Sequence, residues 1–217
     1  DAVAMCYTSG TTGRPKGAML SIRNLMYNPQ QTEAYAGWSD GHDEVLMSAF
    51  PLFHIAGLSV HIAALRYGCR TLLIPDPRDM DFICRQLLRF PPTRIAAVPT
   101  LYQMLVNTPA FREVDFSRLK IALSGAAPLP LDDRKRIEAI IGANRLSDVF
   151  GMTETGPVHV CNPPMRCKPT AVGIPVARLA DTSVRRNVVA VSLSIWSGMT
   201  VVCGFVLNFW QLLAARI

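Results

Sequence analysis

The alternation of apolar and polar positions predicts an α/β fold over roughly the first 150 residues. Short apolar runs alternate with longer segments whose apolar residues recur at helical spacing, which is the pattern of βαβ construction. A sheet covered by helices is therefore expected. The predicted strands are residues 2–7, 45–50, 70–74, 94–98, 119–123 and 145–150, and the predicted helices are residues 22–36, 55–67, 79–90, 99–106 and 130–141.

Boundary residues support these predicted elements. Ser21 is suited to cap the first helix, and Gly68 and Gly142 follow two of the others as stop signals. Open α/β sheets bind their ligands in the loops at one end of the strands. The loops that follow the predicted strands are therefore the expected location of a ligand site.

One such loop, residues 7–17 (YTSGTTGRPKG), is rich in groups that hold phosphate. Its eleven residues contain three glycines, four Ser or Thr hydroxyls, one arginine and one lysine. Glycines let backbone N–H groups approach oxygens closely, hydroxyls donate hydrogen bonds, and the cations offset negative charge. The loop differs from a Walker A motif, because Lys16 is followed by Gly17 rather than by Ser or Thr. Taken alone, the segment has a flexible connector as its alternative interpretation.

Four segments together resemble the adenylate-forming (AMP-binding) superfamily, which includes acyl-CoA synthetases, luciferases and the adenylation domains of peptide synthetases. Residues 7–17 are similar to its signature loop, and residues 50–57 (FPLFHIAG) to the segment beside the acyl pocket. Residues 123–129 (LSGAAPL) resemble the adenine-side loop, and residues 149–156 (VFGMTETG) the Tyr/Phe-Gly-x-Thr-Glu motif. The four occur in the family's order. The resemblance covers residues 1–177, which are expected to form a partial large N-terminal domain of such an enzyme.

This resemblance implies the chemistry of acyl activation. A carboxylic acid attacks the α-phosphorus of ATP, pyrophosphate leaves, and the acyl-AMP passes its acyl group to a thiol, usually that of coenzyme A. Apolar residues within 53–60 favour a fatty acid or a related carboxylic acid. The residues that the resemblance assigns to nucleotide binding are Thr8, Ser9, Gly10, Thr11, Thr12, Gly13, Lys16, Ser124, Gly125, Ala126, Ala127, Phe150, Gly151, Met152 and Thr153.

The resemblance also implies catalytic roles for Lys16, His54, Thr153 and Glu154. Lys16 would bring positive charge to the β- and γ-phosphates, Thr153 would donate to the α-phosphate, and Glu154 would ligate Mg²⁺ through a carboxylate oxygen. Phe150 would stack on adenine, and His54 would lie near the acyl pocket or the attacking carboxylate. Two alternatives stay open: His54 as a hydrogen-bonded histidine without a chemical role, and Glu154 as an ordinary loop carboxylate.

The resemblance further implies that parts of the family's enzymes are missing from this chain. These parts are the first third of the enzyme, the later Asp that binds the ribose hydroxyls, the hinge, and the small C-terminal domain with the lysine of the adenylation step. Ile22 stands where the family often carries His. We therefore expect that this polypeptide does not complete catalysis by itself.

Composition narrows the class of protein. The 217 residues are long enough for a sizeable core, and the formal charge is +6. Because no run of five or more basic residues occurs and aromatic residues do not interleave with the cations, nucleic-acid binding is disfavoured. The six cysteines form no C-x-x-C pair, which favours a reduced, cytoplasmic setting. The spacing of His159, Cys161 and Cys167 matches no zinc pattern and is interpreted as coincidence.

Residues 178–217 carry a different pattern from the rest. No charged residue occurs from Asn187 to Ala215. A helix over residues 187–207 would be about 31 Å long, enough to cross the hydrocarbon core of a bilayer. The arginines before it would keep its N-terminal side cytoplasmic. Membrane association through this segment is expected, with a buried core helix as the alternative.

Residues 178–217 also resemble a fragment of a major facilitator transporter, from the loop after the second span to the start of the fourth. One span cannot form a translocation pathway, so a fusion or an assembly artefact of two fragments is the simplest account. Two functions remain in competition: a fragment of an ATP-dependent acyl-CoA synthetase, and a membrane-tethered, non-catalytic nucleotide-binding or fusion protein. A generic phosphate-loop NTPase is disfavoured, because neither Gly-Lys-Ser/Thr nor a matching acidic strand occurs.

Overall fold

The computed structural model describes residues 1–9, 14–36, 43–163, 166–168 and 171–176. Contacts divide the chain into two compact units, residues 1–177 and 178–217, and all described residues belong to the first. The uncharged segment at 187–207 and the transporter-like segment lie outside the described residues. No helix within the described ranges is long and apolar enough to cross a bilayer.

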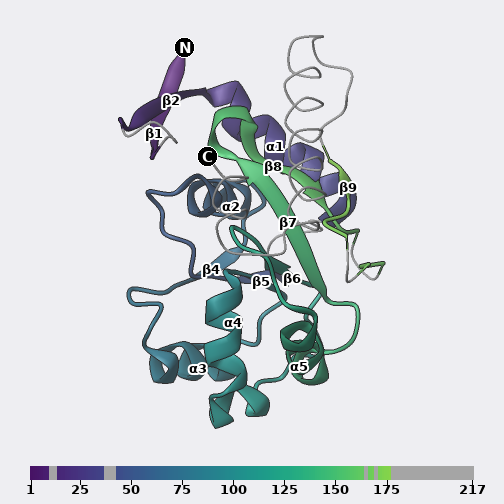
Figure 1. Cartoon of the computed structure of the whole chain (residues 1–217). Helices are drawn as coiled ribbons and strands as arrows, with labels where there is room; N and C mark the ends of the chain where they lie inside the picture. Colours follow the sequence, from purple (N-terminus) through teal and green to yellow (C-terminus); the bar gives the residue numbers. More distant parts are fainter. Residues whose placement is uncertain (10–13, 37–42, 164–165, 169–170, 177–217) are drawn as a thin grey trace. The chain divides into compact units, whose positions relative to one another are not determined.

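A seven-stranded sheet is the largest element of the first unit (Figure 1). Its strands are β3 (Val45–Ser48), β4 (Arg70–Leu73), β5 (Arg94–Ala97), β6 (Ile121–Ser124), β7 (Leu146–Met152), β8 (Gly156–Cys161) and β9 (Ile174–Pro175). Their order in space is β4-β3-β5-β6-β7-β8-β9. The first five strands in this order pair in parallel, whereas β8 and β9 join antiparallel.

Helices cover both faces of the parallel part of the sheet. They are α1 (Ile22–Ala36), α2 (Ile55–Arg66), α3 (Met80–Arg89), α4 (Pro99–Val106) and α5 (Leu131–Ile141), with a short 3-10 helix η2 (Pro109–Glu113) after α4. Helices α3, α4 and α5 pack with Met47 of β3 in one apolar cluster. Ala64 of α2 packs with Leu46 of β3 in another. Because neighbouring strand residues point to opposite faces, this strand is buried on both sides and is apolar along most of its length.

The N-terminal strands form a separate two-stranded antiparallel sheet, β1 (Ala2–Thr8) with β2 (Lys16–Ser21). Cys6 and Leu20 of this hairpin are buried in a small cluster with Leu25 of α1 and Ile55 of α2. Helix α1 in turn contacts α2 and β8. The hairpin is therefore joined to the rest of the unit mainly through the first two helices.

Ser21 caps α1 as predicted. Its hydroxyl oxygen accepts a hydrogen bond from the Asn24 backbone N–H at 3.2 Å, and Asn24 Oδ1 accepts one from the Ser21 backbone N–H at 3.1 Å. Two otherwise unsatisfied N–H groups at the helix start are satisfied by this reciprocal arrangement.

All five predicted helices are present, with each end within one residue of its predicted position, and the six predicted strands are present within two residues. Strands β2, β8 and β9 were not predicted. The loops after the predicted strands do not contain all of the motif residues. Lys16 begins β2, Phe150 and Gly151 lie within β7, and Glu154 lies in the 3-10 helix η3 (Thr153–Thr155). The reason is antiparallel pairing, of β2 with β1 and of β7 with β8, which a local pattern does not reveal.

Candidate functional site

The structure brings β2, the strand in which the glycine-rich loop ends, into contact with the segment that contains Glu154. Strand β2 begins at Lys16 and contacts η3, in which Glu154 is the middle residue. Both side chains are exposed. A cation and a carboxylate from distant parts of the sequence therefore lie on contacting elements and are open to solvent.

The two ends of the glycine-rich loop are held together by the hairpin. Thr8 pairs with Lys16 across the two strands, and its hydroxyl donates to the Lys16 carbonyl oxygen at 3.5 Å. Ser9 and Arg14, at the two margins of the loop, are exposed. The predicted phosphate-binding residues Gly10, Thr11, Thr12 and Gly13 lie outside the described residues.

Glycine is required at position 151 by the close approach of the next strand. A Cβ atom there would lie 1.4 Å from the carbonyl oxygen of Pro157, an impossible contact. The pairing of β7 with β8 is irregular at this point, and Met152 lies opposite Gly156. The tight connection holds Thr153 and Glu154 at the end of a short antiparallel pair. The glycine of the Phe-Gly-Met-Thr-Glu pattern thus has a steric reason in addition to the chemistry expected of the motif.

The loop after β6 combines backbone strain with a buried hydroxyl. Ala126 has a φ of 67°, a left-handed conformation that costs a residue with a Cβ atom about 1–2 kcal/mol. Ser124 is 2% exposed, and its hydroxyl has no hydrogen-bond partner among the described residues. Gly125 is buried, whereas Ala126 and Ala127 are exposed. Strain and unsatisfied polar groups concentrate at functional sites, so both features favour a binding role for this loop.

His54 has a structural role at the start of α2. It is the N-cap residue, and its Nδ1 accepts a hydrogen bond from the Ala56 backbone N–H at 3.1 Å. In the neutral ring this acceptor role assigns the proton to Nε2. The imidazole is exposed. The hydrogen bond from Ala56 therefore supports the alternative of a purely structural histidine. A chemical role for His54 stays a proposal.

Sequence reasoning missed Asn28, which links two elements of the candidate site. Its side chain is 7% exposed. Nδ2 donates to the Val158 carbonyl oxygen at 2.7 Å, and Oδ1 accepts from the Val158 N–H at 3.3 Å. The bond pair joins α1, which follows the glycine-rich loop, to β8, which follows Glu154. A polar residue just before Pro29 inside a helix was the available sequence signal, and it does not reveal the partner.

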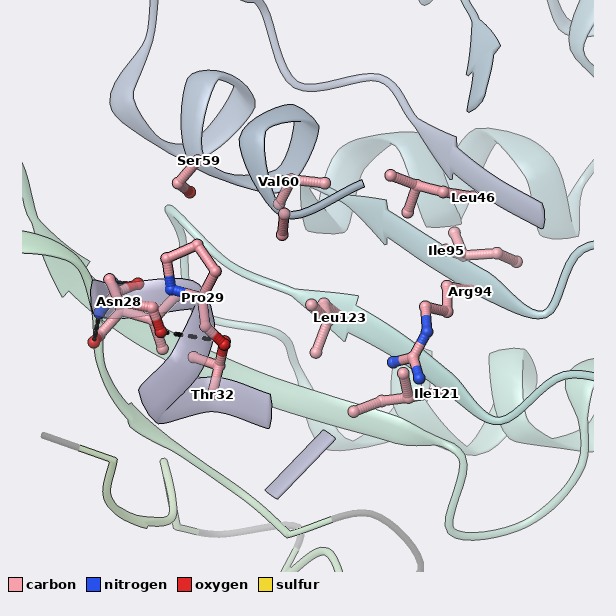
Figure 2. Close-up of a pocket in the computed structure, with 12 residues that line it drawn as sticks. Asn28, Pro29, Thr32, Leu46, Ser59, Val60, Arg94, Ile95, Ile121 and Leu123 are labelled. Carbon is pink, nitrogen blue, oxygen red and sulfur yellow. Dashed lines mark hydrogen bonds between the residues drawn. The ribbon is translucent and has the colours of Figure 1, made fainter. Parts of the chain in front are cut away.

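A cavity of about 50 Å³ lies between α1, α2 and one face of the sheet (Figure 2). Most of its wall is apolar and includes Val60 of α2, Leu123 of β6 and Val158 of β8. Val60 ends the apolar segment 53–60 that the sequence associates with the acid. The cavity is too small for a whole substrate, because ligand pockets usually measure several hundred Å³.

A buried group of charges lies at one end of this cavity. Glu44 is 1% exposed and accepts a hydrogen bond from the Thr93 hydroxyl. Its carboxylate also lies 3.3 Å from Arg94 Nε and 2.5 Å from Lys120 Nζ. Burial alone would raise the pKa of the Glu44 carboxyl, but these partners outweigh burial and hold that pKa below its ordinary value. The Glu44 carboxylate is therefore charged in the folded protein.

A second buried ion pair supports β7. Arg134 of α5 is 1% exposed, pairs with Asp148, and donates to the Leu146 carbonyl oxygen at 2.7 Å. Burial raises the pKa of the Asp148 carboxyl, although Arg134 opposes this effect. The pair fixes α5 against the strand that ends in the Phe150–Glu154 segment.

The described part of the chain contains no group of three or more His, Cys, Asp or Glu residues that could hold a metal ion. A Mg²⁺ ion bound with a nucleotide needs fewer protein ligands, because phosphate oxygens and water complete its coordination. Glu154 suits that role, since it is exposed and forms no ion pair with another described residue.

Comparison with protein families gives one match that covers most of the chain. A family described as "AMP-binding enzyme" matches residues 1–186, and so continues past Ala177. The long-chain-fatty-acid–CoA ligase of Yersinia pestis is 35% identical over 179 residues, which are 81% of this chain and 32% of that protein.

Solved structures show the same similarity. Apo MatB from Rhodopseudomonas palustris matches with a TM-score of 0.70 at 34% identity, over 81% of this chain and 34% of that one. A malonyl-CoA ligase in a ternary product complex with methylmalonyl-CoA and AMP matches with a TM-score of 0.68 at 31% identity, over 79% and 37%. The chain spans about a third of the length of these relatives.

Proposed function

Because the chain belongs to the AMP-binding enzyme family, we propose that it serves the ATP-dependent activation of a carboxylic acid. In this proposal the acid becomes an acyl-AMP, and its acyl group is transferred to coenzyme A. Similarity to a long-chain-fatty-acid–CoA ligase supports a fatty acid or a related acid as the substrate class. The chain spans about a third of the length of its relatives. The steps proposed for this part are the binding of the nucleotide and of the acid.

The glycine-rich loop is the proposed phosphate site. The attacking carboxylate and the triphosphate are both anions, so the protein must neutralise charge and hold the reacting groups in line. Lys16 would supply the charge, and the hydroxyls of the loop would direct the β- and γ-phosphates. The proposed ligands of the loop are Thr8, Ser9, Gly10, Thr11, Thr12, Gly13 and Lys16.

The segment after the close contact at Gly151 is the proposed site for the α-phosphate and Mg²⁺. Glu154 would ligate the ion, and Thr153 would donate to the α-phosphate. A bound Mg²⁺ would neutralise charge on the phosphate oxygens. Phe150 would stack on adenine, with Met152 beside it. The loop Ser124 to Ala127 would form the other side of the base slot.

The observation that carries this proposal is the contact between β2 and η3. Two segments that were expected to grip one magnesium-bound nucleotide lie on contacting elements, although a long stretch of sequence separates them. Exposure of both Lys16 and Glu154 adds support, because a nucleotide could reach them.

The test is nucleotide binding by the full chain, measured with a fluorescent ATP analogue in the presence of Mg²⁺. We expect Lys16→Ala and Glu154→Ala each to weaken binding by about tenfold or more, since charge-assisted hydrogen bonds contribute roughly 1.5–3 kcal/mol. Lys135→Ala and Glu113→Ala remove exposed charges elsewhere and should leave binding unchanged. Equal affinity in all four variants would refute the site assignment.

The uncharged stretch from Asn187 to Ala215 favours a second candidate function, a membrane-tethered non-catalytic protein. Residues 1–177 would then be the nucleotide-binding domain, and residues 178–217 the attachment to the bilayer. The expected result is that the full chain sediments with membranes, whereas a version ending at Ala177 stays in the supernatant. Recovery of both in the supernatant would eliminate the tether.

A further inference from the structure

The loop between β6 and α5, residues 125–130, is anchored at its start and open to solvent in its middle. Gly125 is buried, and its backbone N–H donates to the Ala97 carbonyl oxygen, at the end of β5, at 3.3 Å. Ala126 and the two residues after it are exposed. The φ of 67° at Ala126 is a strained conformation, which persists only where the surrounding structure fixes the backbone. The groups that hold the two ends of this loop therefore decide its shape.

Tyr102 of α4 fixes the start of the loop. Its side chain is 0% exposed, and its hydroxyl donates to the Leu123 carbonyl oxygen at 3.0 Å. Burial raises the pKa of the Tyr102 phenol well above its ordinary value, so the hydroxyl stays protonated and remains a donor. Leu123 directly precedes Ser124, the last residue of β6. The hydrogen bond therefore sets the position of the backbone from which the loop begins.

Gln103, the next residue of α4, fixes the helix that follows the loop. Its Nε2 donates to Asp133 Oδ2 at 2.6 Å, and Asp133 lies in the first turn of α5. Helices α4 and α5 are in contact and lie on the same side of the sheet (Figure 1). Two adjacent residues of one helix thus hold the segments before and after the loop.

The loop also packs against the strand that carries Phe150. A Cβ atom at position 125 would lie 2.7 Å from Cγ2 of Val149, so Gly125 is in close contact with that side chain. Phe150, the residue proposed to stack on adenine, follows Val149 directly in β7. A displacement of the loop would therefore disturb both sides of the proposed base slot.

We propose that Tyr102 and Gln103 are positioning residues of the nucleotide site, which keep the base slot in shape by holding the two ends of loop 125–130. The inference rests on the proposed function, in which this loop forms one side of the slot. Tyr102 is fully buried and the Gln103 amide is bound to Asp133, so both act through the loop and not on the nucleotide itself. Loss of either bond should weaken contacts to adenosine and leave the phosphate contacts of the glycine-rich loop and of Thr153–Glu154 unchanged.

The test compares the affinity of the full chain for ATP and for inorganic tripolyphosphate, both with Mg²⁺, by titration calorimetry. Tripolyphosphate lacks the base and the sugar, so the ratio of the two affinities reports the contacts to adenosine. The unmodified chain should bind ATP more tightly by about tenfold or more. We expect Tyr102→Phe and Gln103→Met each to weaken ATP binding about fivefold, which is the contribution of one typical hydrogen bond, and to change tripolyphosphate binding less than about twofold.

Two control variants separate this role from a general loss of stability. Leu105→Val reduces the packing of a buried residue in the same helix without removing a hydrogen bond, and it should lower stability but keep the ratio. Gln86→Met removes the amide of a half-buried glutamine of α3, and it should also keep the ratio.

Each positioning variant is judged separately. An unchanged ratio, whether both ligands weaken or neither does, overturns the role of that residue. Circular dichroism checks folding, and Gln103→Met decides should Tyr102→Phe not fold. An unmodified chain that binds both ligands equally has no base slot, which overturns this inference and leaves the proposed phosphate site in place. An unmodified chain that binds neither ligand refutes the proposed function, and this inference with it.

Discussion

At the scale of single residues, two ionisable side chains that lie close in sequence differ in their exposure to solvent. Glu154 is exposed, whereas His159 in the following strand is 6% exposed. Burial lowers the pKa of the His159 imidazole, because the charged ring loses its hydration. The folded protein therefore holds His159 in its neutral form near neutral pH.

The burial of His159 predicts that the free energy of unfolding depends on pH. Below an ordinary imidazole pKa of about 6.5, the unfolded chain binds a proton that the folded chain does not yet bind. The free energy of unfolding should therefore fall as the pH is lowered from about 7.5 to 5.5. In urea titrations at several pH values, His159→Gln should reduce this slope.

The control for this experiment is Val160→Ala, a truncation of the next buried residue in the same strand. It removes packing without removing a titrating group, so it should lower stability at every pH by a similar amount and keep the slope. Asp148, whose pKa is raised, acts in the opposite direction and contributes equally to all three proteins. An unchanged slope in His159→Gln would contradict the prediction.

At the scale of elements, α1 connects the two halves of the candidate site. The helix begins after the hairpin that holds the glycine-rich loop, and Asn28 on its buried side binds both backbone groups of Val158 in β8. Pro29 follows directly and supplies no backbone N–H of its own. The Asn28 side chain thus fixes the helix to the strand after Glu154.

Replacing Asn28 should loosen this connection. We expect Asn28→Ala to lower the free energy of unfolding by about 1–3 kcal/mol, because both Val158 backbone groups lose a buried partner. The amide of Val158 should also exchange faster with deuterium. Asn107→Ala removes an exposed bond to Arg136 and should change stability by less than about 0.5 kcal/mol. Similar losses in both variants would show that the Asn28 bonds are unimportant.

At the scale of the whole unit, the apolar clusters that hold the structure differ greatly in size. Twenty buried residues pack between the sheet and α3, α4 and α5. The hairpin β1–β2 depends on a cluster of four buried residues. Its other side is apolar and exposed, with Met5 and Tyr7 at 54% and 72%. Elements with few buried contacts open at a lower free energy than the core.

Hydrogen exchange should therefore divide the unit into two parts. Amides of β1 and β2 are expected to exchange about a hundredfold faster than those of β3, β5 and β6, which corresponds to about 2.7 kcal/mol. Addition of MgATP should slow exchange in the hairpin more than in the sheet, if the loop between β1 and β2 binds phosphate. Uniform exchange, or equal slowing everywhere, would contradict this division.

Local patterns were sufficient for the helices and the parallel strands. Periodicity of 3.6 residues and short apolar runs report directly which side chains are buried, and Ser21 marks the first helix start through a bond that spans three residues. Strands β2 and β8 were not predicted, because each lies beside a glycine-containing motif and depends on an antiparallel partner. The role of Gly151 also depends on a partner, since the clash that excludes a side chain comes from Pro157.

The sequence by itself determined the α/β architecture and the four motifs that mark the AMP-binding family, because both depend on residue types at short, regular spacings. The tertiary structure alone decided that β2 meets η3, that Asn28 holds Val158, and that Arg94 lines a cavity beside Glu44. Each of these joins residues far apart in the chain. A local pattern shows that a side chain is buried, whereas only folding selects the atoms that it meets.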